Sequence, residues 1–115
     1  MCFSILTPGI TFIKILGNVL DMTLEKVRAD ISRTDSEIIR LIAHRQELAE
    51  KIVRIKIKDG LPVHDEHRTA RVLEAVFNLA VEKKIDPVAV QEIFRILIAM
   101  SEDRQREYSG EGNLP

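Results

Sequence analysis

Residues 23–58, TLEKVRADISRTDSEIIRLIAHRQELAEKIVRIKIK, decide the fold, because this stretch contains neither glycine nor proline. Apolar side chains recur along it at the three- and four-residue spacing of one helical face. They are Leu24, Val27, Ile31, Ile38, Leu41, Ile42, Leu48, Ala49, Ile52 and Ile55. The pattern predicts one helix about 50 Å long at 1.5 Å per residue. Thr23 is its expected N-cap, and Asp59, Gly60 and Pro62 form its expected stop.

Two shorter helices are predicted after this stop. The first begins near Asp65, whose side chain can cap the free amides of the first turn, and runs to about Lys84. The second begins at Asp86, an N-cap, with Pro87 as the first helical residue. The residues expected to face inward are Val72, Val76, Leu79 and Ala80 on the first of these helices, and Val90, Phe94, Leu97 or Ile98, Ser101, Gln105 and Tyr108 on the second.

The composition agrees with an all-α fold in a single domain. Five glycines and four prolines among 115 residues, with 45% hydrophobic and 30% charged residues, favour a packed helical protein. We expect the domain to span residues 22–108. Residues 1–21 are interpreted as an extension from an early start codon, or as a short membrane-surface or packing segment, and residues 109–115 as a disordered tail.

Charge and cysteine content exclude several function classes. A net charge of −1 gives no electrostatic case for nucleic-acid binding. The apolar N-terminal stretch is interrupted by Pro8, Gly9, Lys14 and Gly17, so we expect neither a membrane span nor a signal peptide. The single cysteine, Cys2, excludes an intrachain disulfide and agrees with a cytoplasmic location.

Charged residues interrupt the apolar face of the long helix. Arg28, Asp35 and Lys56 fall on one line of positions spaced by seven, and Arg45 falls on the adjoining line. A single long basic side chain at the edge of a helical seam usually keeps its charge in water. Three cations on one face instead favour an anionic ligand, because buried cations need anions and Asp35 is the only carboxylate on these lines.

The spacing of these cations favours a dimer. Arg28 and Lys56 are roughly 42 Å apart along one helix, so they cannot contact one small ligand within a chain. A helix this long also cannot bury its apolar face against two short helices. If it pairs antiparallel with its copy about a two-fold axis near Ile38 and Ile39, Arg28 of the partner subunit falls between Arg45 and Lys56. Each dimer would then contain two anion sites that use both chains.

These residues resemble the all-helical chorismate mutase family. The resemblance rests on the pattern Arg28-x6-Asp35-x9-Arg45-x10-Lys56-x8-Asp65-x2-Arg68, on LIAHRQELA at 41–49, and on FRILIAMSEDRQ at 94–105 with Ser101 and Gln105. It covers about residues 24–105 and implies an intertwined antiparallel homodimer of three-helix chains. Such a protein converts chorismate to prephenate by a Claisen rearrangement, without cofactor or covalent intermediate, in aromatic amino-acid biosynthesis.

The resemblance also implies roles for individual residues. Arg45 and Arg28 of the partner subunit would bind the two substrate carboxylates, and Ser101 would hold a carboxylate. Lys56 and Gln105 would meet the ether oxygen, with Lys56 also touching a carboxylate. Asp65 and its neighbourhood would meet the ring hydroxyl, supported by Arg68.

Position 69 departs from the pattern. Family members usually carry a glutamate there that binds the ring hydroxyl, whereas Thr69 is shorter and neutral. Its hydroxyl could contact the substrate directly or through water, or leave this contact to Asp65. We therefore expect an active enzyme with weakened substrate affinity.

Two other functions compete with this one. Isochorismate-pyruvate lyases use a related helical fold with the same arginines and lysine, and the missing glutamate at position 69 slightly favours them, whereas Ser101 favours the mutase. The second is a helical dimer without catalysis, in which the cations would face one another without an anion. His64 and His67 flank Asp65, but histidines beside an exposed turn are more often solvated than bound to metal.

Overall fold

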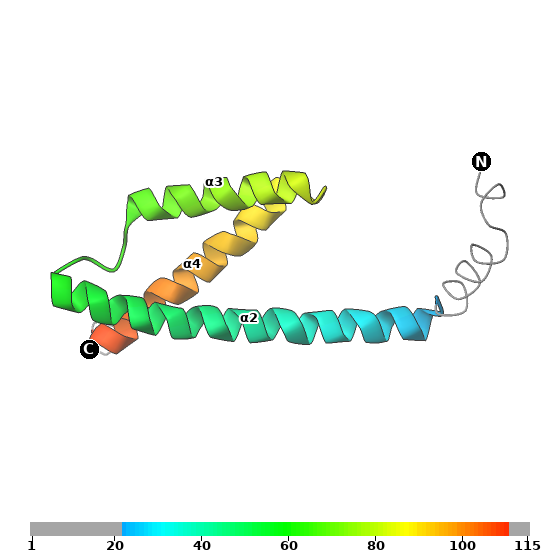
Figure 1. The fold of residues 1–115 in the computed structure, drawn as a ribbon, viewed down its shortest axis with the longest axis horizontal. Coiled ribbons are helices and arrows are strands. Elements are labelled where there is room, and N and C mark those ends of the chain that lie inside the picture. The colour runs from blue at the N-terminus through cyan, green and yellow to red at the C-terminus, as the bar shows by residue number, and fades with distance from the viewer. Residues whose placement is uncertain (1–21, 111–115) are drawn as a thin grey trace, which may run out of the picture. The chain divides into compact units, whose positions relative to one another are not determined.

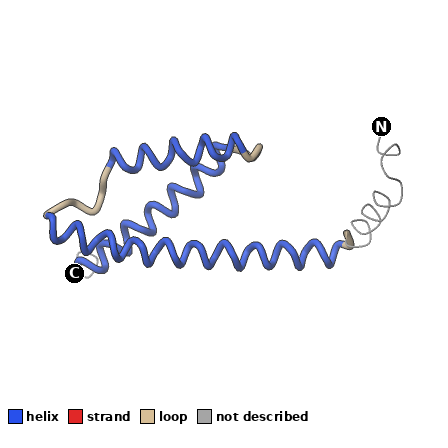
Figure 2. The backbone as a smooth tube through the Cα atoms, viewed as in Figure 1, coloured by secondary structure: helices blue, strands red, loops and turns tan. Residues whose placement is uncertain are grey.

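The computed structural model describes residues 22–110, which form three helices: α2, Leu24–Asp59; α3, Glu66–Glu82; and α4, Pro87–Ser109 (Figure 1). No strand occurs within this described range (Figure 2). The all-α prediction with one very long helix is therefore confirmed. The expectations for residues 1–21 and 111–115 fall outside the described residues, but Ser109, assigned to the tail, is the last residue of α4.

The ends of α2 follow the capping residues expected from the sequence. The Thr23 hydroxyl accepts a hydrogen bond from the Lys26 amide at 3.1 Å. At the other end Gly60 has a φ of 68°, and the Leu61 amide donates to the Lys56 carbonyl at 2.8 Å. This left-handed glycine closes the helix and turns the chain away from its axis, which places the segment before α3 beside the last turns of α2.

Side-chain caps also start α3 and α4. Asp65 accepts from the Arg68 amide at 3.0 Å, and Asp86 accepts from the Val88 amide at 3.0 Å, with Pro87 following it. Between the two helices Lys84 takes the left-handed conformation, with a φ of 60°. α3 and α4 form a helical hairpin that packs with the second half of α2.

The chain divides into two compact units at the boundary between Arg40 and Leu41. Within the second unit the buried apolar side chains come from α2 and α3 and are small or branched. They are Ala49, Val53, Leu73, Val76 and Ala80. Polar contacts also tie α2 to α4: for example, Arg104 donates to Glu50 at 2.6 Å, and the Arg54 guanidinium lies 5.0 Å above the Tyr108 ring.

Two of the residues predicted to face inward do not. Leu79 is 55% exposed, and Leu73 is buried in its place because the face of α3 that packs is rotated from the predicted one. Tyr108 is also exposed, since its ring covers the Arg54 guanidinium at the surface instead of entering the core.

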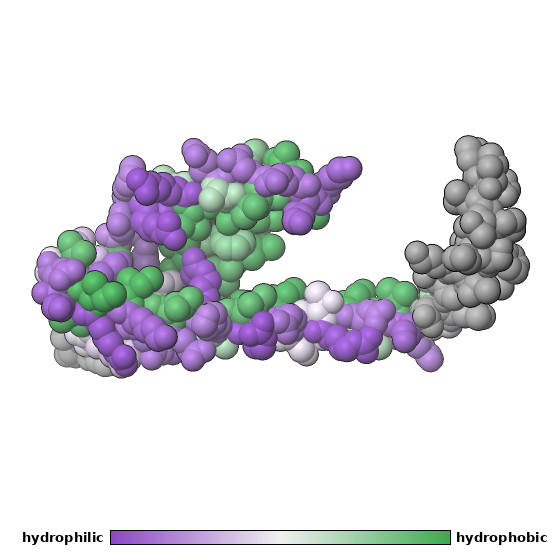
Figure 3. All heavy atoms as spheres, viewed as in Figure 1, coloured by the Kyte–Doolittle hydropathy of each residue, from purple (hydrophilic) through white to green (hydrophobic). Residues whose placement is uncertain are grey.

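In the first unit the described residues of α2 are all exposed. Leu24 is 64% exposed, Ile31 55% and Ile38 49%, although their spacing places them on one helical face. In Figure 3 apolar residues follow one edge of this part of α2, and polar residues follow the other. Within residues 22–110, no helix has both the length and the apolar character needed to cross a membrane.

Candidate active site

A pocket of about 430 Å³ opens in the second unit, where α2, α3, α4 and the segment between α2 and α3 meet. Its α2 residues recur every three or four positions and therefore share one helical face. The pocket is lined by Arg45, Leu48, Ala49, Ile52, Lys56, Val63, Asp65, Arg68, Thr69, Val72, Ile98, Ser101, Glu102 and Gln105.

The structure brings together most of the site residues expected from the sequence. The ones that line this single pocket are Arg45, Lys56, Asp65, Arg68, Thr69, Ser101 and Gln105. Arg28 is not among the lining residues. It lies in the first unit, where its side chain is exposed.

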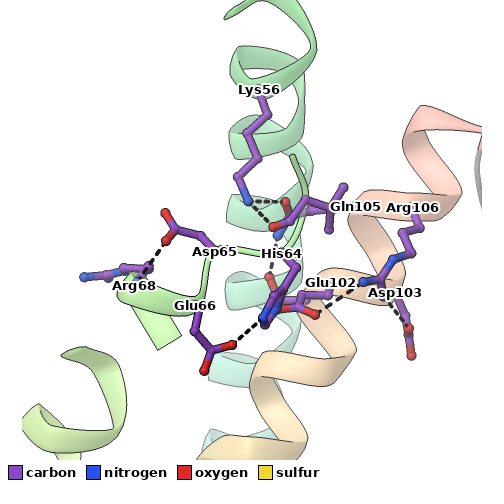
Figure 4. A network of polar contacts seen from close by, with 11 residues as sticks. Lys56, His64, Asp65, Glu66, Arg68, Glu102, Asp103, Gln105 and Arg106 are labelled. Carbon is purple, nitrogen blue, oxygen red and sulfur yellow. Dashed lines mark hydrogen bonds and ion pairs between the residues drawn. The ribbon is translucent and has the colours of Figure 1, made fainter. Parts of the chain in front are cut away.

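Lys56 is held in the pocket by two neutral acceptors. Its ammonium donates to the backbone carbonyl of Val63 and, at 2.9 Å, to Oε1 of Gln105 (Figure 4). An ammonium has three N–H groups, so these two bonds fix its position and leave one donor for a ligand. The two acceptors therefore fix the position of the Lys56 ammonium in the pocket. Because both are neutral, neither cancels its positive charge.

Gln105 is the one buried polar side chain in the described part of the molecule, with an exposure of 4%. Because lysine can only donate, the amide oxygen must face Lys56, and the amide nitrogen donates to the Ser101 hydroxyl at 3.1 Å. The two residues are four apart on α4 and so lie on one face. The second N–H of the Gln105 amide remains available to a ligand.

Two guanidinium groups share the pocket with this ammonium. Arg45 donates to the backbone carbonyl of Leu97 at 3.0 Å. Burial, and to a smaller degree the nearby charge of Arg68, lower the pKa of Arg45 from its ordinary value. Both causes penalise the positive charge, so an anion bound in the pocket would offset this penalty by pairing with the guanidinium groups.

The α3 side of the pocket carries a carboxylate and a hydroxyl. Asp65 accepts the Arg68 amide, and that bond, with a smaller contribution from Lys56, lowers the pKa of its carboxyl group. Asp65 is therefore ionised at neutral pH. Thr69 follows one turn later, partly buried, and its amide donates to the Asp65 carbonyl at 3.0 Å.

Several functional groups were not found from the sequence. The Val63 carbonyl gives no sequence signal, because any residue supplies one. Glu102 also lines the pocket, but a glutamate among other charged residues of a helix gives no sequence signal of its own. His64 is exposed, as expected from the sequence, but its ring nitrogens also lie 2.8 Å from Glu102 and 2.8 Å from Glu66, which the sequence did not predict (Figure 4). His67 is exposed, as expected.

The arrangement is suited to holding an anion rather than to covalent chemistry. Lys56 and Arg45 donate to neutral oxygens. The Asp65 carboxylate accepts from the Arg68 amide, and the Glu102 carboxylate pairs with His64 and Arg106. Fixed donors around a partly apolar pocket can stabilise negative charge as it develops in a bound molecule.

Comparisons with known proteins identify relatives of this chain. The family model described as chorismate mutase type II matches residues 27–106. A chorismate mutase of Methanocaldococcus jannaschii is 32% identical over 85 residues, which cover 74% of this chain and 86% of that protein. A bifunctional chorismate mutase/prephenate dehydratase of Aquifex aeolicus is 39% identical over 56 residues, and one of Buchnera aphidicola 30% over 74. The matches cover 49% and 64% of this chain but only 16% and 19% of those two proteins.

Proposed function

The chain belongs to the type II chorismate mutase family, and we propose that it converts chorismate to prephenate by a Claisen rearrangement. The observation that carries the proposal is the convergence of Arg45, Lys56 and Arg68 on one pocket, with neutral acceptors on the first two. Such a pocket favours a small anion, and chorismate carries two carboxylates.

The reaction is unimolecular and needs neither an acid nor a base. The protein must hold the dianion in its compact chair-like conformer and stabilise the transition state. Apolar side chains such as Leu48, Ile52 and Ile98 line the pocket and would enclose the ring. We assign one substrate carboxylate to Arg45, and a carboxylate contact to the Ser101 hydroxyl.

Lys56 and Gln105 are the groups that we expect to accelerate the reaction. As the C–O bond breaks ahead of C–C formation, negative charge grows on the ether oxygen. The remaining N–H of the Lys56 ammonium and the free amide N–H of Gln105 would be donated to that oxygen. A preorganised donor of this kind is commonly worth about 3 kcal/mol in the transition state. Gln105 also holds Lys56 in place before substrate arrives.

The ring hydroxyl is assigned to the α3 side of the pocket. Asp65 is ionised there and can accept a hydrogen bond, with Arg68 beside it. Thr69 can donate or accept through its hydroxyl but is shorter than a glutamate. We therefore expect this contact to be the weakest one that the substrate makes.

An antiparallel homodimer completes the site in this proposal. The first half of α2 exposes apolar side chains along one face, which in water favours burial against another chain. Pairing about an axis near Ile38 and Ile39 would bring Arg28 of the partner subunit to the pocket, between Arg45 and Lys56. Arg28 would bind the second substrate carboxylate, and both chains would intertwine around two equivalent sites.

The remaining parts of the proposal concern the setting of the reaction. No cofactor or metal is needed for a pericyclic rearrangement. Prephenate would be consumed in phenylalanine and tyrosine biosynthesis. A cytoplasmic location is supported by the single cysteine of the sequence, which suits a reducing compartment.

A direct assay tests the function. The purified protein is given chorismate or isochorismate in separate reactions, and prephenate and pyruvate are both measured. We expect prephenate from chorismate and no pyruvate from either substrate. Pyruvate from isochorismate would assign the chain to the lyases, and no turnover of either, with no thermal stabilisation by a chorismate analogue, would favour a non-catalytic dimer.

A further inference from the structure

His64 joins three parts of the second unit outside the contacts assigned to the substrate. It lies in the segment between α2 and α3. Nδ1 is 2.8 Å from Oε2 of Glu102 on α4, and Nε2 is 2.8 Å from Oε2 of Glu66 on α3 (Figure 4). The side chain thus connects the segment to both helices of the hairpin at once.

The geometry specifies the protonation state of the ring. A neutral imidazole has one N–H, so it can donate to one of the two carboxylates while its other nitrogen directs a lone pair at the second. Only the imidazolium donates through both nitrogens. Two carboxylate oxygens at hydrogen-bond distance on opposite sides of the ring therefore indicate a doubly protonated His64.

The groups on either side of His64 belong to the pocket. The preceding residue, Val63, supplies the carbonyl that holds the Lys56 ammonium, and the following residue, Asp65, lines the α3 side. Glu102 lines the pocket from α4, and its side chain is only 16% exposed. Fixing His64 against Glu102 therefore fixes two walls of the pocket relative to each other.

We propose that His64, as an imidazolium, is a positioning residue that ties the Val63–Asp65 segment to α3 and α4 and thereby shapes the substrate pocket. This inference rests on the proposed function for its effect on catalysis, but the ion pairs themselves can be tested without substrate. His64 itself makes no contact with the substrate in this proposal. It acts through Val63, Asp65 and Glu102.

The charges around His64 determine when this connection is present. Glu102 faces it from α4 and Glu66 from α3, whereas Lys56 on α2 is bonded to the neighbouring Val63 carbonyl. Arg106 draws on the other oxygen of Glu102 at 3.5 Å and is itself paired with Asp103. The two carboxylates, Glu102 first and then Glu66, raise the pKa of His64 above its ordinary value of 6.5.

A raised pKa gives a definite pH dependence. The connection is fully present below the pKa of the unfolded chain, near 6.5, and is lost as the pH rises through the higher value in the folded protein. Above that pH a neutral ring keeps at most one of its two bonds. The segment then loosens, and the substrate must order it on binding.

The expected kinetic effect is therefore on substrate affinity. We expect KM to rise roughly threefold to fivefold on the alkaline side, since ion pairs at a partly exposed site contribute modestly. The value of kcat should stay constant, because bound substrate holds the segment in place. This separates His64 from Lys56 and Gln105, whose removal would lower kcat.

The first experiment is an NMR titration of the full chain without substrate. The His64 ring signal should titrate above pH 6.5, and the backbone amides of residues 63–68 should shift with the same midpoint. Glu102→Gln and Glu66→Gln should each lower that midpoint. A midpoint at or below 6.5, unchanged in both variants, would overturn the proposal whether or not the protein turns over chorismate.

The second experiment compares KM across pH 6 to 9 in matched variants. His64→Gln should have a raised KM at every pH, without the alkaline rise. His64→Arg keeps a permanent cation with several donors, so KM should stay low across the range. His44→Gln, at an exposed histidine outside the pocket, should behave as the unaltered protein does. If His64→Gln shows the unaltered KM profile, the positioning role is excluded even though the mutase activity stands.

Discussion

The two halves of α2 carry apolar residues at the same spacing but differ in what covers them. From Leu41 onward the helix buries Ala49 and Val53 and directs Arg45 and Lys56 into a pocket. Up to Arg40 the described residues of the helix are all exposed, including Ile31 and Ile38. The spacing of apolar residues thus predicts that a helix forms, but it does not predict whether its own chain buries the apolar face.

The difference assigns separate tasks to the halves. The second half supplies most of one pocket, whereas the first half presents an apolar face and the cation Arg28 to another chain in our proposal. If this division is correct, substitutions in the second half should affect the chemistry directly. Those in the first half should affect assembly, or a site on the partner subunit.

The largest effect is expected from Ile38→Lys in the first half. Ile38 lies near the proposed two-fold axis, so each chain would contribute one lysine to the same place. The two positive charges would repel each other, and both chains would lose buried apolar area at the interface. We expect the dimer dissociation constant to rise by a factor on the order of 10³ to 10⁴, from about 5 kcal/mol of lost burial and desolvated charge. Sedimentation at several protein concentrations measures it.

Ser36→Lys is the matched control for this substitution. Ser36 is also exposed in the first half but is two residues away and so points to nearly the opposite side of the helix. It should leave the dissociation constant unchanged. Equal effects of the two substitutions would contradict the assignment of the apolar face to the dimer.

In the second half, Lys56→Met should lower kcat/KM roughly 200-fold, because one preorganised donor to the developing charge, worth about 3 kcal/mol, is lost. Methionine is only one atom shorter and keeps the apolar stem of lysine, so the fold should persist. Lys58→Met removes a charge from the same last turn, but Lys58 is exposed and outside the pocket. The Lys58→Met variant should retain full activity in the chorismate assay. A loss of activity in this control would indicate a general effect of removing a positive charge.

Arg28→Ala should lower kcat/KM on the order of 100-fold, as expected for one cation that meets a buried carboxylate. The decisive measurement mixes this variant with Lys56→Met and lets the subunits exchange. If each site combines Arg28 of one chain with Lys56 of the other, half of the dimers contain one intact site. Activity should then recover to about a quarter of that of the unaltered protein.

A site contained within one chain gives a different result in this mixture. Both chains would then carry a damaged site, and mixing would restore nothing. Arg33→Ala, which removes another exposed arginine of the first half, should be fully active alone. If both variants are dimeric and activity does not recover in the mixture, the proposal that the first half of α2 serves a site on the partner subunit is wrong.

Most of the fold followed from capping residues and apolar spacing. Thr23, Asp65 and Asp86 cap helices where the sequence placed them, because the bonds involved are local. The rotation of α3 that buries Leu73 instead of Leu79 depends on how α3 packs against α4, and no local pattern specifies it.

The candidate site was predicted less completely than the fold. Residues on one helical face, such as Arg45 and Lys56, could be grouped by spacing. The ion pair between His64 and Glu102 joins residues 38 positions apart, and the acceptor for Lys56 at Val63 is a backbone carbonyl. Neither has a signal in a single sequence, because both depend on how the chain packs.

Gln105→Glu tests, through the pH dependence of kcat, whether the side chain at position 105 donates a hydrogen bond to the ether oxygen. Gln105 can donate to the ether oxygen at any pH, so kcat of the unaltered protein should be flat between pH 6 and 8. A glutamate there must be protonated before it can donate, so kcat should fall about tenfold for each pH unit above its pKa. Gln46→Glu makes the same change outside the pocket and should leave the profile flat.

The smallest effect is expected at Thr69, on the α3 side of the pocket that the second half of α2 helps to form. A longer, ionised side chain would reach the ring hydroxyl, so Thr69→Glu should raise kcat/KM roughly threefold to tenfold, about the net worth of one ordinary hydrogen bond. Ala70→Glu adds the same charge at the next, exposed position and should change nothing. If Thr69→Glu instead loses activity and Thr69→Val does too, the threonine hydroxyl itself contacts the substrate. The α3 wall would then be adapted to that shorter side chain.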